Sequence, residues 1–506
     1  MKNIEKEPFG TIYVPDGISV KASREFTPEE TLKETYFFTN TGKFPRLTSP
    51  NDIGINIPFF DNCFTQIWCG GTSSYVMCLQ MSGDGPHPGL VLTKGGLFNY
   101  SFKESLTLHP LPMEFEPGET VVLEWELFWH KGKNDFYEQI LKYPSFVEIK
   151  TKHFVAFQGE DNQPEIIHRK EQDRFTLVKK IKGSENIYTI RGKNTETWCR
   201  TLELPPLTEL AAERCLFIAE KQQYRKPGSA LDGAYLAYNY KEEHIFYNYN
   251  IDKNICKEGI IMGALMARFL CICPNPQNTL TESLKNYLTF VLRELFDSKT
   301  GMVYDDILRS SPEAVKLDNF SWMAQFFLEL HELWKENAFL RYAWLVMKKI
   351  YELGGEKFYP VNLPVVQMID CFDKAGMINE SEELKKYFTN HAGFILLNES
   401  NNPDILASAA EILMQAYIIF KEDKYFESGK KQMEIILLFS GMQPDYRLYG
   451  NSLNCLAYVW FQKAWKINEP ENENNSVKTA EDSIRKAIAC VDDQDWGLYY
   501  ALRFLN

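Results

Sequence analysis

The sequence predicts an α+β protein with two domains, and two observations carry that prediction. Over residues 1–200, apolar and polar side chains alternate with a period of two between turn signals, as they do in antiparallel strands. From about residue 201 onward, apolar side chains recur with a period of 3.6, as they do in amphipathic helices. We therefore expect an antiparallel β-sandwich over residues 1–200 and a helical domain over residues 201–506.

The clearest strand is TVVLEWELFWH, which ends at His130. Leu123, Trp125, Leu127 and Trp129 fall on one face of it, and Glu, Phe and His side chains occupy the other. Many strands of this kind, separated by turns, predict a large antiparallel sandwich. Other strand-like runs that end at Gly, Asn or Asp are KETYFFTNTG, HFVAFQGED and DRFTLVKKIKG.

The helical half contains roughly eleven segments joined by short loops. In SWMAQFFLELHELW, Trp322, Phe326 and Leu330 form one apolar face, and Ser321 is the expected N-cap. Helix pairs recur about every 40 residues, which predicts either an α-solenoid or a closed ring of helical hairpins. Irregular aromatic-rich loops such as KFYPVNLP favour the ring, because loops of that kind can line one mouth.

Composition excludes several classes of partner. The net charge is -13, and no basic block interrupts it, which argues against nucleic acid. No run of about 18 apolar residues is present, so no membrane span is expected. The start, MKNIEKEPFG, lacks an apolar signal-peptide region, which predicts action in the cytoplasm. The sequence leaves a homo-oligomer open.

Cysteine spacing and phosphate motifs predict neither a metal nor a cofactor. The eleven cysteines are scattered, and only Cys271 and Cys273 lie close together, so zinc spacing is absent and reduced thiols are expected. No phosphate-binding loop, nucleophile elbow, HExxH or dinucleotide fingerprint occurs in a usable context. Segment 468–478, NEPENENNSVK, is acidic and Asn-rich and is expected to form an exposed loop or a disordered insert.

Several stretches together resemble a bacterial family of six-hairpin glycosidase-like proteins, the β-glucuronidases with an N-terminal β-sandwich and a C-terminal (α/α)6 barrel. The resemblance covers nearly the whole chain in order. It implies an (α/α)6 toroid over residues 201–506 and removal of a terminal uronic acid from a glycan. The carrying stretches are IWCGGTSSYVMCLQMSGDGPHPGLVLTKGGL, LEWELFWHKGKNDF, LDGAYLAYNY, GEKFYPVNLP, GMQPDY and DDQDWGLYYALRF.

Glycoside hydrolysis requires two carboxyl groups, one to protonate the leaving oxygen and one to activate water or attack the sugar. Our candidates are Glu258, Asp232 and Asp306. Glu258 stands in the run that corresponds to a charged segment of the family. Asp232 precedes Gly233 and could equally be a turn residue. Asp306 and Asp305 are adjacent, and two carboxylates that are both shielded from water raise each other's pKa. A solvent-exposed loop with no such effect is the plainer interpretation.

The substrate-binding candidates are aromatic residues that could stack on a sugar, cations that could hold a uronate carboxylate, and polar residues that could contact hydroxyls. The resemblance suggests that a loop of the sandwich reaches the mouth of the barrel. Near the C-terminus, Asp493 and Asp495, with Trp496, are expected to close the ring rather than to act on substrate. The candidates are Trp68, His87, Lys94, Tyr235, Lys257, Arg309, Asn319, Trp322 and Arg447.

Three functions remain in competition. A β-glucuronidase-like hydrolase is favoured, with a uronic-acid-containing glycan as its substrate. A catalytically degenerate carbohydrate-binding or interaction protein is the alternative, because DKNICKEGIIMG keeps only Lys257 and Glu258 of the family's charged run. A polysaccharide lyase in the same barrel is the third. It would need a base beside a neutralised uronate carboxylate.

Overall fold

The computed structural model divides the chain into two compact units. The β unit comprises Met1–Ala156, Asp161–Glu203 and Leu438–Leu448, and the helical unit comprises Phe157–Glu160, Leu204–Leu437 and Tyr449–Asn506. The chain is therefore a multidomain α+β protein, as predicted. The described residues are 3–7, 10–57, 63–80, 85–102, 105–167, 175–193, 195–247, 255–275, 277–309, 316–360, 362–398, 403–439, 443–448, 454–468, 476–490 and 494–505.

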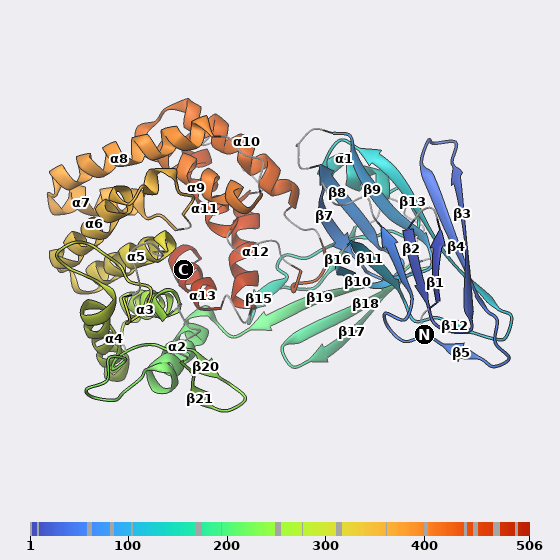
Figure 1. Cartoon of the computed structure of the whole chain (residues 1–506), viewed down its shortest axis with the longest axis horizontal. Helices are drawn as coiled ribbons and strands as arrows, with labels where there is room; N and C mark the ends of the chain where they lie inside the picture. The colour runs from blue at the N-terminus through green and yellow to red at the C-terminus, as the bar shows by residue number, and fades with distance from the viewer. Residues whose placement is uncertain are drawn as a thin grey trace. The chain divides into compact units, whose positions relative to one another are not determined.

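Two large antiparallel sheets share one core in the β unit (Figure 1). Their strands are β1 (Asn3–Glu7), β2 (Gly10–Val14), β3 (Ile18–Phe26), β4 (Leu32–Asn40), β6 (Gly54–Ile57), β7 (Cys63–Trp68), β8 (Tyr75–Gln80), β9 (His87–Lys94), β10 (Leu97–Phe102), β11 (Leu106–Pro110) and β13 (Thr120–His130). The sheet orders are β1-β2-β6-β11-β10 and β3-β4-β13-β9-β8-β7. Ile55 and Leu108 of the first sheet pack in one cluster with Phe38 and Trp125 of the second.

Smaller elements complete the β unit. Residues 443–448 join it because Tyr446 donates its N–H to the carbonyl of Arg200 at 3.1 Å, and Arg200 donates to the carbonyl of Pro444 at 2.9 Å. The remaining strands are β5 (Arg46–Leu47) with β12 (Glu114–Phe115), β14 (Glu148–Lys150) with β16 (Glu165–Ile167), and a sheet of order β15-β19-β18-β17 made of β15 (Val155–Phe157), β17 (Thr176–Lys182), β18 (Glu185–Arg191) and β19 (Glu196–Leu204). One helix, α1 (Lys133–Ile140), follows β13.

Strand β13 departs from the predicted alternation in its second half. Leu123 and Trp125 are fully buried, as expected, but Trp129 is 61% exposed, whereas Phe128 and His130 are buried. Phe128 stacks on Phe136 of α1 with ring centroids 5.4 Å apart. Because α1 covers the second face, this strand end is buried on the side that the pattern assigned to solvent.

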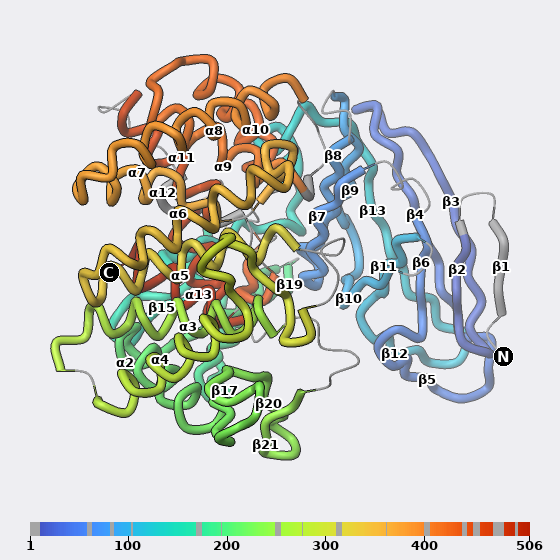
Figure 2. The backbone as a smooth tube through the Cα atoms, turned by 60° about the vertical axis from the view of Figure 1, so that its left-hand side comes forward, coloured from blue at the N-terminus to red at the C-terminus, as the bar shows by residue number. Residues whose placement is uncertain are grey.

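The helical unit consists of consecutive helices, and its last helix returns to its first ones. In the described residues these helices are α2 (Leu207–Phe217), α3 (Ile255–Ile272), α4 (Asn278–Phe290), α5 (Leu317–Trp334), α6 (Asn337–Glu352), α7 (Val365–Ala375), α8 (Ile378–Leu397), α9 (Pro403–Phe420), α10 (Asp423–Phe439), α11 (Asn454–Asn468), α12 (Ser476–Ile488) and α13 (Gln494–Phe504). Helix α13 packs against α2 and α3, and α3 packs against α5 (Figures 1 and 2).

A bidentate ion pair joins the last helix, α13, to the first, α2. Arg214 of α2 donates from Nε and Nη2 to the two carboxylate oxygens of Asp495 in α13, at 2.6 and 2.9 Å. Asp495 thus has the structural role expected for it. No helix in the described part of the chain is long and apolar enough to cross a membrane.

Helix α5 begins earlier than its sequence pattern predicts. It starts at Leu317, so Ser321 lies inside the helix, fully buried, rather than at its N-cap. The apolar stripe of Trp322, Phe326 and Leu330 is buried as expected. The extra turn matters because it carries Asp318 and Asn319 at the start of the helix.

Helices α2 and α4 end in the same way. Each continues into a π-helical turn, Ile218–Gln222 after α2 and Val291–Leu295 after α4. Each loop that follows contains a left-handed glycine, Gly233 with φ of 92° and Gly301 with φ of 74°. These loops lead to the starts of α3 and α5. The same π-helical turn therefore precedes two helix N-termini.

Gly301→Ala should destabilise the helical unit by about 2 kcal/mol or more. A Cβ at Gly301 would lie 2.2 Å from the carbonyl oxygen of Leu345, and the positive φ adds backbone strain. Gly354→Ala is the matched control, because Gly354 has a φ of 86° but a Cβ there would meet no atom within 4 Å. Urea unfolding of both variants separates the clash from the strain, and equal losses would contradict the close packing.

Candidate active site

Asp305 connects the starts of α3 and α5. Its carbonyl oxygen accepts the N–H of Cys256 in the first turn of α3 at 3.2 Å. Its Oδ1 accepts the Nδ2–H of Asn319 in the first turn of α5 at 2.6 Å. Asn319 itself is 1% exposed, whereas Asp305 is half-buried. One carboxylate is therefore held in a fixed orientation between two helix N-termini.

Two carboxylates and two ammonium groups act on one another here. Burial raises the pKa of Asp305, and the Asn319 hydrogen bond and Lys316 oppose that rise. Asp318 is exposed, but the surrounding protein raises its pKa too, against the pull of Lys257 and Lys316. We call Asp305, Asp318, Asn319, Lys257 and Lys316 the α3/α5 end. A carboxyl of raised pKa beside cations is the arrangement that acid catalysis on an anionic sugar uses.

The other predicted acids have plainer surroundings. Asp306 is buried, and its Oδ1 accepts the N–H of Leu308 at 2.8 Å, which is a turn contact. Asp232 accepts the N–H of Lys226 at 2.9 Å and so also stabilises a turn. Glu258 is exposed in the first turn of α3, next to Lys257.

Two predicted aromatic contacts lie in the core of the helical unit. Tyr235 is fully buried, stacks on Tyr287 at 4.3 Å and shares a 3.0 Å hydrogen bond with Ser283. Trp322 is 6% exposed and packs against Tyr499 at 5.7 Å. These placements favour packing over stacking on a sugar.

Arg309 lies beside the α3/α5 end. It is exposed, and its guanidinium is 4.9 Å from the ring centroid of Tyr304, the residue before Asp305. Its Nη2 donates to the carbonyl of Arg293 at 2.8 Å. Residues 251–254 and 310–315, which adjoin this end in sequence, lie outside the described residues.

The remaining predicted contacts belong to the β unit. Trp68 is buried with its ring 6.0 Å from that of Trp198. His87 is buried, and its Nδ1 accepts the N–H of Gln80 at 3.1 Å. Arg447 pairs with Asp445, at 2.6 Å from Nη2 to Oδ2, and Lys94 is exposed.

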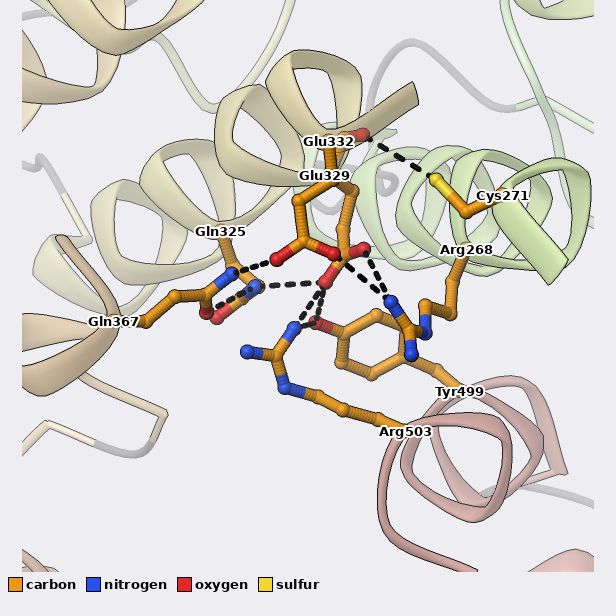
Figure 3. Close-up of polar contacts among 8 residues, drawn as sticks. All are labelled: Arg268, Cys271, Gln325, Glu329, Glu332, Gln367, Tyr499 and Arg503. Carbon is orange, nitrogen blue, oxygen red and sulfur yellow. Dashed lines mark hydrogen bonds and ion pairs between the residues drawn. The ribbon is translucent and has the colours of Figure 1, made fainter. Parts of the chain in front are cut away.

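A buried polar cluster in the helical unit escaped the sequence analysis (Figure 3). Glu329 of α5 is fully buried and accepts hydrogen bonds from Tyr499 at 2.7 Å, from Gln325 at 3.0 Å and from Arg503. Arg268 of α3 pairs with Glu332 at 2.9 Å. Gln325, Glu329 and Glu332 share one helix face at positions i, i+4 and i+7. This spacing inside an apolar helix was the available signal.

The described residues show neither a group of metal ligands nor a disulfide. In the described ranges, no three or more His, Cys, Asp or Glu side chains are grouped so that they could hold a metal ion. The ten cysteines whose side chains the structure describes are free thiols.

Glu411 of α9 should make stability depend on pH. It is buried, it accepts N–H groups from Leu363 at 3.1 Å and Asn362 at 3.3 Å, and burial raises its pKa to about 8 from 4.5. The folded state therefore keeps a proton that the unfolded chain loses. Wild-type stability should fall by roughly 3–5 kcal/mol as pH rises from about 4.5 to about 8.

Glu411→Gln should remove most of that dependence, because glutamine does not titrate. Urea unfolding of both proteins across this pH window measures the difference. Parallel curves for the two proteins would contradict the assignment to Glu411.

Comparison with known proteins gives a fold and no family. No family model matches the chain, and no curated protein matches it. A solved polysaccharide lyase matches 99% of this chain and 90% of its own, with a TM-score of 0.86 and 22% sequence identity. The chain has the fold of a polysaccharide lyase. A family 76 glycoside hydrolase from a bovine Bacteroides thetaiotaomicron strain matches 87% of the chain and 98% of its own, with 9% identity and a TM-score of only 0.38.

Proposed function

We propose that this chain is a glycan-processing enzyme that removes a terminal uronic acid, β-glucuronidase-like in reaction. We further propose that its β unit is a β-sandwich and its helical unit an (α/α)6 toroid, which the return of α13 to α2 and α3 supports. The observation that carries the function is the α3/α5 end, where two carboxylates of raised pKa lie among lysines.

In the proposed hydrolysis, Asp305 is the acid. Burial raises its pKa, which favours the protonated form that can donate to the leaving oxygen, and Asn319 holds its orientation. Glu258 or Asp318, exposed in the first turns of α3 and α5, supplies the second carboxylate that activates water or attacks the sugar.

The lysines supply recognition of the substrate. Lys257 and Lys316 would hold the uronate carboxylate, and the positive ends of α3 and α5 add to their attraction. An ammonium is a point charge, so we expect weaker geometric selection than an arginine fork would give.

A lyase is the second candidate, because the matched fold belongs to one. In that reaction a base takes the proton from the carbon beside the uronate carboxylate, the O4 substituent leaves, and a C4–C5 double bond forms. The same lysines would neutralise the carboxylate. Asp305 as the acid would protonate the departing oxygen.

Incubation with a panel of two sets of oligosaccharides tests the proposal, one that ends in a uronic acid and one in which an internal uronic acid carries a sugar on its O4. Free uronic acid, detected by chromatography, supports hydrolysis. An unsaturated product with far-ultraviolet absorbance supports elimination instead. Tight binding without either product contradicts an enzyme and supports a carbohydrate-binding protein.

A further inference from the structure

The ammonium group of Lys463 in α11 lies over two aromatic rings. Its ammonium nitrogen lies 4.5 Å from the ring centroid of Trp460 and 4.9 Å from that of Phe504. The guanidinium of Arg503 lies 5.8 Å from the same Phe504 ring. Two cations of neighbouring helices thus share one aromatic ring.

No carboxylate neutralises Lys463 within the part of the chain that the structure describes. The carboxylate of Glu329 pairs with Arg503 and accepts a hydrogen bond from Tyr499. The carboxylate of Glu332 pairs with Arg268. The group of Lys463, Arg503 and Arg268 therefore carries three positive charges against two negative ones. The side chain of Lys463 is exposed, but the protein packed around its stem and the nearby Arg503 lower its pKa to about 8.

Neutral polar groups border these charges (Figure 3). Gln367 of α7 donates to Glu332 at 3.1 Å, and its Oε1 accepts from Gln325 at 3.0 Å. Glu332 keeps 31% of its side chain exposed and Arg268 keeps 20%. Donors and acceptors that reach solvent beside a surplus of positive charge are what a sugar with a carboxylate requires.

We propose that Lys463, Arg503, Arg268, Glu332 and Gln367 form a second binding site, for a carboxylated sugar, near the C-terminal ends of α3, α5, α11 and α13. Lys257 and Arg268 are 11 residues apart on α3, and Asp318 and Glu332 are 14 apart on α5. At 1.5 Å per residue, this site lies about 16 to 21 Å along the helices from the α3/α5 end. The class of ligand rests on the proposed function, whereas the site is separate from the α3/α5 end.

The charge of Lys463 is decisive for this site. Helix C-termini carry partial negative charge and oppose an anion, so binding depends on the side-chain cations. An acidic sugar would gain a charge-assisted contact with Lys463 that a neutral sugar cannot make. Above pH 8 the ammonium loses its proton, so affinity should fall between pH 7 and pH 9.

Calorimetric titration with methyl glucuronide and with methyl glucoside tests the proposal. The full chain carries Lys257→Met and Lys316→Met throughout, so that the α3/α5 end does not contribute. We expect carboxylate-dependent binding that Lys463→Met weakens about tenfold or more. Lys466→Met should leave binding unchanged, because Lys466 is exposed like Lys463 but lies one turn away, and Lys463→Arg should keep binding.

Several outcomes would overturn the site. They are no glucuronide binding in the background protein, equal binding of glucuronide and glucoside, and unchanged affinity after Lys463→Met. Inorganic phosphate as a competitor distinguishes a sugar site from a general anion site, because phosphate that displaces glucuronide while binding more tightly contradicts sugar recognition. Circular dichroism confirms that each variant is folded.

Discussion

Asp305→Asn should lower the rate of uronide cleavage by about 10²- to 10⁴-fold, the usual contribution of general acid catalysis. The substitution removes the proton donor but keeps an oxygen that can accept the 2.6 Å hydrogen bond from Asn319. Folding should therefore be unaffected. Because burial raises the pKa of Asp305, its protonated form should persist, and with it activity, to higher pH than an ordinary aspartate allows.

Asp306→Asn is the matched control for this prediction. Asp306 is the next residue, but its carboxylate already accepts the N–H of Leu308 in a turn. We expect the Asp306 variant to keep most of its activity, measured as initial rate on the best substrate of the panel. The reverse pattern would give Asp306 the acid role and would contradict the account of the α3/α5 end.

Glu329→Leu should destabilise the helical unit by about 3–5 kcal/mol. Burial raises the pKa of Glu329 even though Arg503 and Arg268 oppose the rise. Replacing both partners of a buried ion pair by apolar side chains can cost little, but removing Glu329 alone leaves the guanidinium of Arg503, which is only 18% exposed, without its carboxylate. The hydroxyl of Tyr499 loses its acceptor as well.

Glu332→Leu is the matched control, because it removes a carboxylate of the same helix face that is less buried than Glu329. It lies on the same helix face and pairs with Arg268, but its side chain is 31% exposed, so water can replace the carboxylate. We expect a loss below about 1 kcal/mol in urea unfolding. If both variants lost similar amounts of unfolding free energy, burial of the carboxylate would not determine how much its removal destabilises the protein.

The sequence predicted the fold where one periodicity governs an element. The strand period of Leu123 and Trp125 and the helix period of Trp322, Phe326 and Leu330 were both confirmed as buried faces. The prediction failed at Trp129, because α1 covers the other face of β13, and at Ser321, because an earlier turn precedes it. Both errors come from tertiary contacts, which a local pattern does not contain.

The candidate site was predicted only in part, and for a related reason. Residue type and loop position drew attention to Asp305, Asn319 and Lys257, which the structure gathers with Asp318 at two helix starts. The sequence analysis chose Asp306 rather than Asp305 as the candidate, because sequence does not show that the carboxylate of Asp306 accepts the N–H of Leu308 in a turn. The Glu329 cluster was missed because partners such as Arg503 lie more than 170 residues away.

A crystal structure of the Asp305→Asn variant with a bound glucuronide tests the central claim most directly. The account predicts the sugar at the starts of α3 and α5, with its carboxylate beside Lys257 or Lys316 and its glycosidic oxygen within hydrogen-bonding distance of residue 305. A sugar bound only elsewhere on the chain, with the α3/α5 end empty, would contradict it.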